Sequence, residues 1–372
     1  MRAIIAAGGT AGHINPGLAI ADKIKEIFPE SGILFIGTPD GMEAGLVREA
    51  GYDFTPIKMA GLQRKLTPNN LVRNAKAAYF YLGAGVKARE IYKKFKPDIV
   101  IGTGAYISMP VVKAAAKTGI KTINHESNSY PGVSTKLLSK YVDKIFTADE
   151  EAVTRIPYSG KCVITGNPLR NNLQFEDRET ARRKLGLPEG LTVLSSGGSN
   201  GSNRITEAVI ALLGWENEKG GINHIHSYGR NGKAVFEQML KNSGVQPNPE
   251  RTIIKEYISN MYTCLSAADL VISRSGSMSQ TEIKAAGRAS VQIPWPGAAE
   301  NHQYFNALSM EKRGAAVLIE DKDLTSGILI KEIARLHGNP DKIREMGLRA
   351  KLMSADKAAD KILGEIIDLL KT

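Results

Sequence analysis

Two glycine-rich turns are the first feature of this sequence that could do chemistry. Residues 8–12 and 197–201 both read Gly-Gly-x-x-Gly, and each turn follows a short apolar run and precedes a helix-like stretch. Such a turn brings backbone N–H groups and a helix N-terminus toward a ligand, which suits a diphosphate. A tight turn without a ligand is the alternative for either loop alone, but two such loops in one chain favour binding.

The first loop departs from the dinucleotide fingerprint. It lacks the Gly-x-Gly-x-x-Gly pattern, and no acid stands about 20 residues beyond it at a clear strand end. This departure argues against an NAD-dependent oxidoreductase. His13 directly follows the loop, and an imidazole that titrates near neutrality can act as a general base for a hydroxyl nucleophile. A packing or capping histidine is the alternative, and the position at the mouth of the loop favours the base.

Polar residues also follow the predicted strand 121–124. They read His125-Glu126-Ser127-Asn128 and would gather at the carboxyl end of a sheet, where open α/β folds bind ligands. These side chains suit a sugar, and the alternative is a solvated loop with internal hydrogen bonds.

The segment 269–282 reads as a strand, a turn of small residues and a helix start, so a phosphate could rest on the helix N-terminus. Glu282 would then accept hydrogen bonds from a ribose diol. The spacing of Ser279 and Glu282 also matches a capping box, and the motif leaves both interpretations open. Farther on, Asn301 and Gln303 suit sugar hydroxyls or the exposed face of an amphipathic helix.

Strand-like and helix-like stretches alternate around these motifs. We expect strands at 3–7, 33–36, 98–102, 121–124, 192–196 and 290–293 and helices at 16–28, 41–51 and 356–370. This alternation predicts the α/β class with parallel sheets covered on both faces, built as two Rossmann-like domains. The expected domains are residues 1–166, completed by the C-terminal helix within 356–372, and residues 167–355.

Composition excludes several classes of protein. The 372 residues are 42% hydrophobic and 23% charged, a balance typical of globular rather than disordered chains. Two cysteines cannot form a disulfide framework, and no Cys/His cluster has metal-ligand spacing. No run of 18 apolar residues occurs, and the N-terminus leaves no room for a signal peptide before the first glycine loop. We therefore expect a cytoplasmic protein without a structural metal.

The net charge of +11 is concentrated in one segment. Residues 58–96 carry ten Lys or Arg and one acid, Glu90, and Tyr79-Phe80-Tyr81-Leu82 interrupts this basic field. Aromatic side chains among cations fit contact with an anionic membrane surface. Nucleic acid is the rival partner, but no recognition-helix, RNP or zinc signature supports it. The alternative without a partner is a solvated basic helix that packs over a buried aromatic stripe.

Several of these segments together resemble the MurG family, the peptidoglycan transferases that add N-acetylglucosamine (GlcNAc) to a lipid-linked muramoyl-pentapeptide. The resemblance spans nearly the whole chain and rests on residues 8–13, 16–19, 125–128, 165–170, 197–201, 274–282, 303–307 and 311–316. Ala11, Asn15 and His302 depart from the usual pattern. The departures leave a related transferase with another acceptor as an alternative.

The resemblance implies a GT-B fold, with two Rossmann-like domains facing each other across a cleft. UDP-GlcNAc would be held mainly by the second domain. Ser199 and the start of the helix near Ser277 would hold its diphosphate. Ile258 would contact uracil through its backbone, and Glu282 would bind the ribose. The implied substrate-binding residues are Thr10, Ala11, Gly12, Asn128, Arg170, Ser199, Ile258, Ser277, Met278, Ser279, Gln280, Thr281, Glu282 and Gln303.

The expected reaction is an inverting transfer that converts lipid I, the undecaprenyl-linked acceptor, to lipid II. His13 is the predicted base and Glu126 the reserve candidate. No cofactor or metal is required, although a divalent ion bound only to the diphosphate stays open. The family implies a peripheral enzyme on the cytoplasmic membrane face that serves cell-wall synthesis, cell shape and division. A UDP-GlcNAc epimerase and a non-catalytic membrane scaffold are the remaining alternatives, and the oligomeric state stays unknown.

Overall fold

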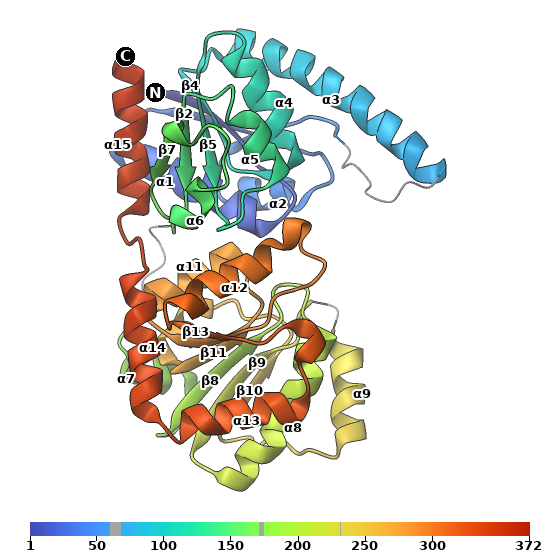
Figure 1. Cartoon of the computed structure of the whole chain (residues 1–372), viewed down its shortest axis with the longest axis vertical. Helices are drawn as coiled ribbons and strands as arrows, with labels where there is room; N and C mark the ends of the chain where they lie inside the picture. The colour runs from blue at the N-terminus through green and yellow to red at the C-terminus, as the bar shows by residue number, and fades with distance from the viewer. Residues whose placement is uncertain (60–67, 171–174, 231) are drawn as a thin grey trace. The chain divides into compact units, whose positions relative to one another are not determined.

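The computed structural model divides the chain into two compact units (Figure 1). Unit 1 is Met1–Asn172 with Ala355–Thr372, and unit 2 is Leu173–Ser354. The backbone is described for residues 1–59, 68–170, 175–230 and 232–372, and the side chains for the same residues except 68–76. The division falls six residues beyond the expected Gly166. Asn167 donates from Nδ2 to the Ser127 carbonyl at 3.0 Å, which holds this stretch to unit 1.

Unit 1 is built on a parallel sheet with strand order β3-β2-β1-β4-β5-β6-β7. Its elements are β1 (Arg2–Ala6), α1 (Ala11–Ile27), β2 (Gly32–Gly37), α2 (Met42–Glu49), β3 (Asp53–Pro56), α3 (Pro68–Phe95), β4 (Ile99–Gly102), α4 (Ala105–Ala116), β5 (Lys121–Glu126), α5 (Val133–Leu138), β6 (Lys144–Thr147), α6 (Glu150–Val153), the 3₁₀ turn η1 (Ser159–Lys161), β7 (Cys162–Ile164) and α15 (Ala358–Lys371).

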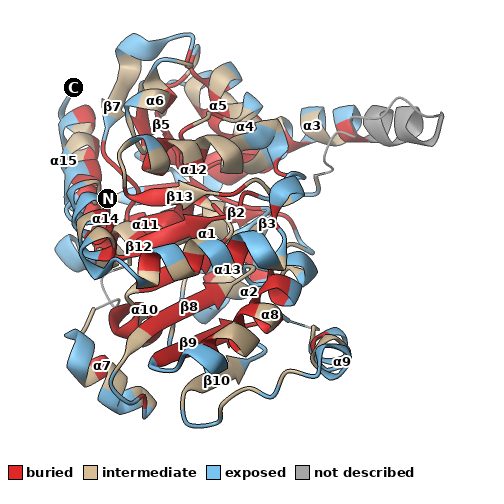
Figure 2. Cartoon of the chain, turned by 60° about the horizontal axis from the view of Figure 1, so that its bottom comes forward, coloured by how far each residue is buried: buried red, intermediate tan, exposed pale blue. Residues whose placement is uncertain are grey.

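Helices cover both faces of this sheet, as the packing partners of successive β1 residues show. Ala3 and Ile5 pack with α1, α2 and α15, whereas Ile4 and Ala6 pack with α3, α4 and α5. Both faces are therefore buried, which explains why the strands read as continuous apolar runs rather than alternating ones. Figure 2 shows the buried strands between partly exposed helices.

The helix expected from Pro16 begins earlier, at Ala11. Proline is common at the first position of helices because it lacks an N–H. The prediction relied on this preference and therefore placed the start of the helix too late. Inside α1, Pro16 cannot donate to the Gly12 carbonyl, and the Ser127 hydroxyl lies 3.4 Å from that oxygen instead. The Thr103 hydroxyl likewise donates to the His13 carbonyl at 2.7 Å. Residues from two other loops thus supply hydrogen bonds at the kink-prone end of α1.

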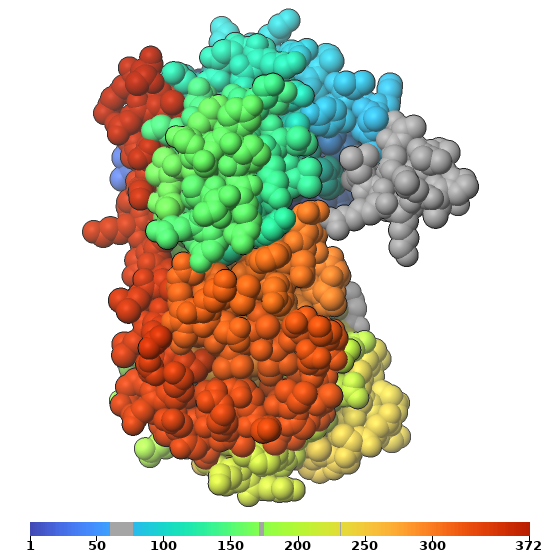
Figure 3. All heavy atoms as spheres, viewed as in Figure 1, coloured from blue at the N-terminus to red at the C-terminus, as the bar shows by residue number. Residues whose placement is uncertain are grey.

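The C-terminal helix α15 belongs to unit 1. Ile362, Leu363, Ile366 and Leu369 enter the same core as Ile14 and Leu18 of α1. The other side of α15 stays exposed, and Figure 3 shows it in red at the surface.

Unit 2 repeats the plan with a parallel sheet in the order β10-β9-β8-β11-β12-β13. Its elements are α7 (Arg178–Leu185), β8 (Leu191–Ser196), α8 (Asn203–Lys219), β9 (Ile222–Ser227), α9 (Lys233–Ser243), β10 (Thr252–Lys255), α10 (Met261–Ala267), β11 (Leu270–Ser273), α11 (Ser277–Ala286), β12 (Ala289–Gln292), η2 (Ala299–Asn301), α12 (His302–Lys312), β13 (Ala316–Leu318), η3 (Asp321–Asp323), α13 (Ser326–His337) and α14 (Pro340–Leu352).

Each sheet has one point at which the strand order reverses. In unit 1 it lies between β1 and β4, and in unit 2 between β8 and β11. Successive connections leave on opposite sides of such a point, so the carboxyl ends of the two strands open a crevice, and open α/β folds bind ligands there. Both Gly-Gly-x-x-Gly loops leave the sheet at these points.

Candidate active site

In unit 1, loops from three neighbouring strands meet at the carboxyl edge of the sheet. Thr10, Ala11 and Gly12 follow β1, residues 103–104 follow β4, and residues 127–132 follow β5. The positive φ in the first loop falls on Gly9, at +82°, while Ala11 begins α1 without a positive φ. Ala11 therefore fits the loop despite its Cβ.

His13 lies in the first turn of α1 and is half-buried against the loop after β4. A Cβ placed on Gly104 would stand 2.3 Å from His13 Nδ1, and Gly104 has φ +109°. Position 104 therefore requires glycine both for its backbone conformation and for the imidazole that packs on it. The hydrogen bond from Thr103 to the His13 carbonyl further fixes this turn.

Glu126 ends β5 and is buried in the loop that follows. Its Oε1 accepts from the backbone N–H and the Nδ2 of Asn128, each at 3.0 Å. Its Oε2 accepts from the Gly132 N–H at 3.0 Å and the Thr135 hydroxyl at 2.6 Å. These four bonds occupy both carboxylate oxygens, so Glu126 holds Asn128 in place.

His125 is wholly buried beside this loop, and its Nε2 lies 3.4 Å from the Gly166 carbonyl. Burial lowers its pKa to about 4, so the ring is neutral at physiological pH. Arg170 forms an ion pair with Asp22 on α1, with Nε 2.7 Å from Oδ2. Because Asp22 lies nine residues along α1 from His13, roughly 13 Å at the usual helical rise, this ion pair does not bring Arg170 beside the imidazole.

Glu43 is a buried carboxylate that the sequence analysis missed. Its Oε1 accepts from the backbone N–H and the hydroxyl of Thr38, at 2.8 and 2.6 Å. A Cβ on Gly8 would lie 2.8 Å from the same oxygen, so the carboxylate packs directly against the first glycine loop. The sequence offered one signal for this carboxylate, an acidic residue in the first turn of the helix that follows β2.

In unit 2, the second glycine loop leaves β8 and leads to Ser202, whose hydroxyl accepts from the Ile205 N–H and caps α8. Ser199 is exposed on this loop, and its carbonyl accepts from the Arg230 N–H at 3.0 Å. Arg274, at the end of β11, donates to the Ser202 hydroxyl at 2.7 Å and forms an ion pair with Asp321 at 2.5 Å. Arg274 thus ties together the two loops at the switch point of this sheet.

The turn after β11 opens α11 at Ser277, with Gly276 as N-cap. Ser279 therefore lies inside the helix, and the capping box with Glu282 is not formed. The first N–H groups of such a helix have no partner within it, and this end carries partial positive charge. The buried residues of this start are Ser277, Met278, Gln280 and Thr281, whereas Ser279 is partly exposed.

Glu282 lies in the second turn of α11 and accepts a hydrogen bond from the Tyr262 hydroxyl at 3.2 Å. The surrounding protein raises the pKa of this carboxyl to about 7, and the bond from Tyr262 opposes the shift. Glu282 is therefore poised between its charged and neutral forms near neutral pH.

Ile258 and Gln303, two other residues predicted to bind the donor, have side chains that contact the protein itself. The Ile258 side chain is buried in the core with Leu265 and Ile283, which leaves its backbone for any ligand contact. Gln303, in the first turn of α12, accepts from the Trp295 N–H at 2.9 Å. Gln303 is partly exposed, and its hydrogen bond anchors the loop before α12.

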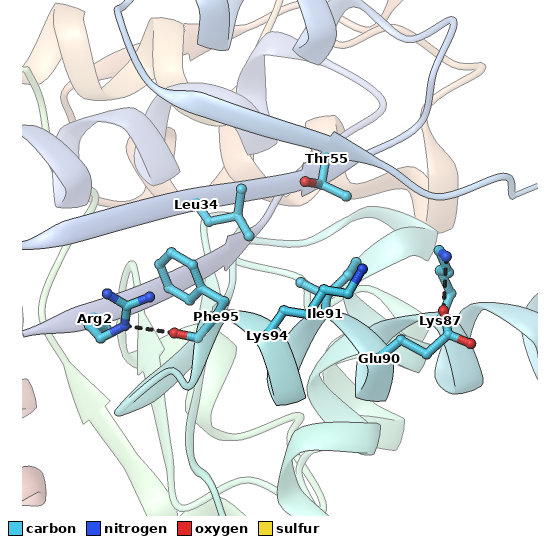
Figure 4. Close-up of a pocket in the computed structure, with 8 residues that line it drawn as sticks. All are labelled: Arg2, Leu34, Thr55, Lys87, Glu90, Ile91, Lys94 and Phe95. Atoms are coloured by element: carbon cyan, nitrogen blue, oxygen red, sulfur yellow. Dashed lines mark hydrogen bonds and ion pairs between the residues drawn. The ribbon is translucent and has the colours of Figure 1, made fainter.

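Unit 1 also contains a pocket of about 410 Å³ between α3 and the sheet (Figure 4). Its lining combines cations with apolar side chains and consists of Arg2, Leu34, Thr55, Lys87, Glu90, Ile91, Lys94 and Phe95. None of these is among the predicted catalytic or substrate-binding residues. Over the residues that are described, no group of three or more His, Cys, Asp or Glu could hold a metal ion, and no helix is long and apolar enough to span a bilayer.

Comparison with known families identifies the class of protein. Residues 3–147 match the glycosyltransferase family 28 N-terminal domain, and residues 192–362 match the glycosyltransferase family 28 C-terminal domain. Each match falls on a separate parallel sheet with its own glycine loop. The fold and the site therefore define a glycosyltransferase of the GT-B type, which confirms the fold class expected from the sequence.

Relatives of full length narrow this class. A protein of Acetivibrio thermocellus is 40% identical over 100% of this chain and 99% of its own length, and one of Desulforudis audaxviator is 39% identical over 100% and 98%. Both are named UDP-N-acetylglucosamine–N-acetylmuramyl-(pentapeptide) pyrophosphoryl-undecaprenol N-acetylglucosamine transferase. The chain belongs to this family, and the resemblance found in the sequence is confirmed.

Solved structures agree with this assignment. The crystal structure of Acinetobacter baumannii MurG has a TM-score of 0.78 at 25% identity and covers 99% of both chains. The UDP-GlcNAc 2-epimerase of Neisseria meningitidis, bound to UDP-GlcNAc, has a TM-score of 0.67 at 13% identity and covers 99% of this chain and 100% of its own. The second likeness is one of fold alone.

Proposed function

We propose that this chain transfers GlcNAc from UDP-GlcNAc to the muramoyl 4-hydroxyl of an undecaprenyl-pyrophosphoryl-MurNAc-pentapeptide. The observation that carries the proposal is similarity of about 40% identity to transferases of this name over the whole chain. The placement of a glycine loop at the switch point of each sheet supports it, because a two-substrate reaction needs two such sites.

Unit 2 would bind the donor. The loop that carries Ser199 and the N-terminus of α11 would hold the diphosphate, since both present backbone N–H groups at the switch point. The N-terminal dipole of α11 also stabilises the charge that grows on the departing UDP. Glu282 would accept from the ribose hydroxyls, Ile258 would meet uracil through its backbone, and Gln303 would bind near the sugar.

Unit 1 would bind the acceptor and supply the base. The first glycine loop would receive the acceptor diphosphate, and His13 would take the proton of the attacking hydroxyl. The oxygen forms its bond to the anomeric carbon as the bond from that carbon to the diphosphate breaks. The electron pair leaves with UDP, and the configuration inverts. Glu126 fits a positioning role better than that of reserve base, because its oxygens already hold Asn128.

Helix α3 supports contact with the membrane that carries this acceptor. Tyr79, Leu82 and Val86 are 74%, 72% and 54% exposed and recur at helical spacing, so they form an apolar stripe. Lys93 and Lys94 lie farther along the same helix. Of the basic residues predicted to join them, Arg64 and Lys65 lie outside the described residues. We propose peripheral binding of this helix to an anionic membrane surface on the cytoplasmic side.

The test is transfer of labelled GlcNAc from UDP-GlcNAc to a lipid-linked muramoyl-pentapeptide analogue. We expect product that depends on the acceptor, and a loss of about 100-fold or more in His13→Ala, the usual range for a general base. His337→Ala, at the end of α13, is the matched control and keeps full activity. Folded protein that binds UDP-GlcNAc but makes no lipid-linked product would overturn the acceptor assignment and favour an epimerase or another transferase.

A further inference from the structure

Five polar side chains form a continuous hydrogen-bonded chain in the interior of unit 2. Glu216 lies 2.8 and 2.9 Å from His224 Nδ1, and His224 Nε2 lies 2.7 Å from Ser195 Oγ. The same hydroxyl lies 2.7 Å from His226 Nδ1, and His226 Nε2 lies 3.4 Å from Thr206 Oγ1. All five are at most 4% exposed, and none of them belongs to the site described above.

The chain is complete in either of two directions. With a neutral His224 that donates to Glu216, Ser195 donates to His224, His226 donates to Ser195, and Thr206 donates to His226. With a protonated His224, the last three bonds reverse together. Burial lowers the pKa of His226 to about 3, so this ring is neutral in both arrangements. Ser195 is the central member, since it alone joins the two imidazoles.

This chain of bonds connects the elements that surround the second glycine loop. Ser195 is the penultimate residue of β8, two positions before the loop, and Thr206 lies in the first turn of α8, five positions after it. His226 lies near the end of β9, which Figure 2 shows beside β8. After β9 the backbone of Tyr228 touches the loop itself, because a Cβ on Gly201 would lie 1.9 Å from the Tyr228 carbonyl oxygen.

Polar groups in a core are costly unless all of them are hydrogen-bonded, but their bonds are directional and apolar contacts are not. An apolar core would hold β8, β9 and α8 together and still tolerate small shifts between them. The bonds through Ser195 instead fix the end of β8 relative to the end of β9 and the start of α8. A shift at these points displaces the backbone N–H groups of the loop.

We propose that the buried chain of Glu216, His224, Ser195, His226 and Thr206 is a positioning network that sets the donor-binding geometry of the 197–201 loop. The proposal rests on the donor role proposed above for that loop. The five residues contact no substrate, and they act through the loop that they bracket. Loss of the network therefore weakens binding of UDP-GlcNAc and leaves the rate at saturating donor nearly unchanged.

The test compares Ser195→Ala with Thr192→Val in steady-state transfer assays. Both residues lie on β8 and are 0% exposed, but Thr192 is at the strand end far from the loop. We expect Ser195→Ala to raise the KM for UDP-GlcNAc about tenfold, the scale of one lost buried hydrogen bond, with kcat within about twofold. Thr192→Val keeps the wild-type KM. A merely structural role would lower the active fraction, which reduces kcat and leaves KM alone.

Ser199→Ala separates failure of this proposal from failure of the donor site. If Ser199→Ala raises the KM and Ser195→Ala does not, the network plays no positioning role and the donor loop stands. If neither variant changes the KM, the donor loop is misassigned and the positioning role is refuted with it. Thermal unfolding of each variant confirms that the compared proteins are folded.

Discussion

We predict that Glu282 makes donor binding depend on pH. Its pKa is raised to about 7 by the surrounding protein, and the proposed contact with ribose requires the ionised carboxylate, because only that form accepts hydrogen bonds from both hydroxyls through both oxygens. Acidification converts the carboxylate to the neutral acid. We therefore expect the affinity for UDP-GlcNAc to fall as the pH drops through 7.

The size of the effect follows from the fraction of Glu282 that is ionised. With a pKa of about 7, roughly nine tenths of the free protein carries the carboxylate at pH 8 and roughly one tenth at pH 6. If the neutral acid contributes no binding, the dissociation constant rises about ninefold to tenfold over this range, or roughly 1.3 kcal/mol. UDP-GlcNAc suits the measurement because its diphosphate diester does not titrate between these values.

Isothermal titration calorimetry of UDP-GlcNAc at pH 6, 7 and 8 measures this dependence. Glu282→Gln is the matched control, since the amide keeps the shape of the side chain and cannot ionise. We expect it to bind weakly at all three values with a flat profile. A wild-type affinity that is constant from pH 6 to pH 8, or a Glu282→Gln variant with the same slope as the wild type, would refute the reasoning.

Three further perturbations test other parts of the structure. Gly104→Ala places a Cβ 2.3 Å from His13 Nδ1 at a φ of +109°. We expect the rate of GlcNAc transfer to fall at least about tenfold and the affinity for UDP-GlcNAc to stay unchanged. Gly119→Ala, with φ +78° and open space around it, is the control for activity. Ile366→Ala removes a wholly buried side chain of α15 and should cost about 2–5 kcal/mol in urea unfolding, whereas Leu352→Ala, 87% exposed, should be nearly neutral. Charge reversal at Lys87, Lys93 and Lys94 should weaken co-sedimentation with anionic vesicles at low salt. The matched control reverses Lys219, Lys241 and Lys331 in unit 2. Equal losses in both variants would contradict a specific role for α3.

The sequence by itself determined the architecture of each unit and the motifs of the site. Apolar runs separated by glycine turns and amphipathic stretches are local patterns, and each needs only the residues that compose it. Both glycine loops, the turn before α11 and the loop after β5 therefore lie at carboxyl ends of parallel strands, as predicted.

Contacts between residues far apart in the chain decided the rest. The start of α1 at Ala11 depends on which backbone groups find partners, and the Gly12 and His13 carbonyls find theirs in Ser127 and Thr103. Such partners lie about 90 to 115 residues away, so no local pattern announces them.

The same reason separates predicted from unpredicted site residues. A lone acid such as Glu43 or Glu216 reads as a surface residue of a helix, because charged side chains are seldom buried. Only the tertiary structure shows that Glu43 packs on the first glycine loop and that Glu216 begins a buried chain reaching the second. Local sequence specifies which elements form, and long-range packing decides which polar groups lose water and must therefore find one another.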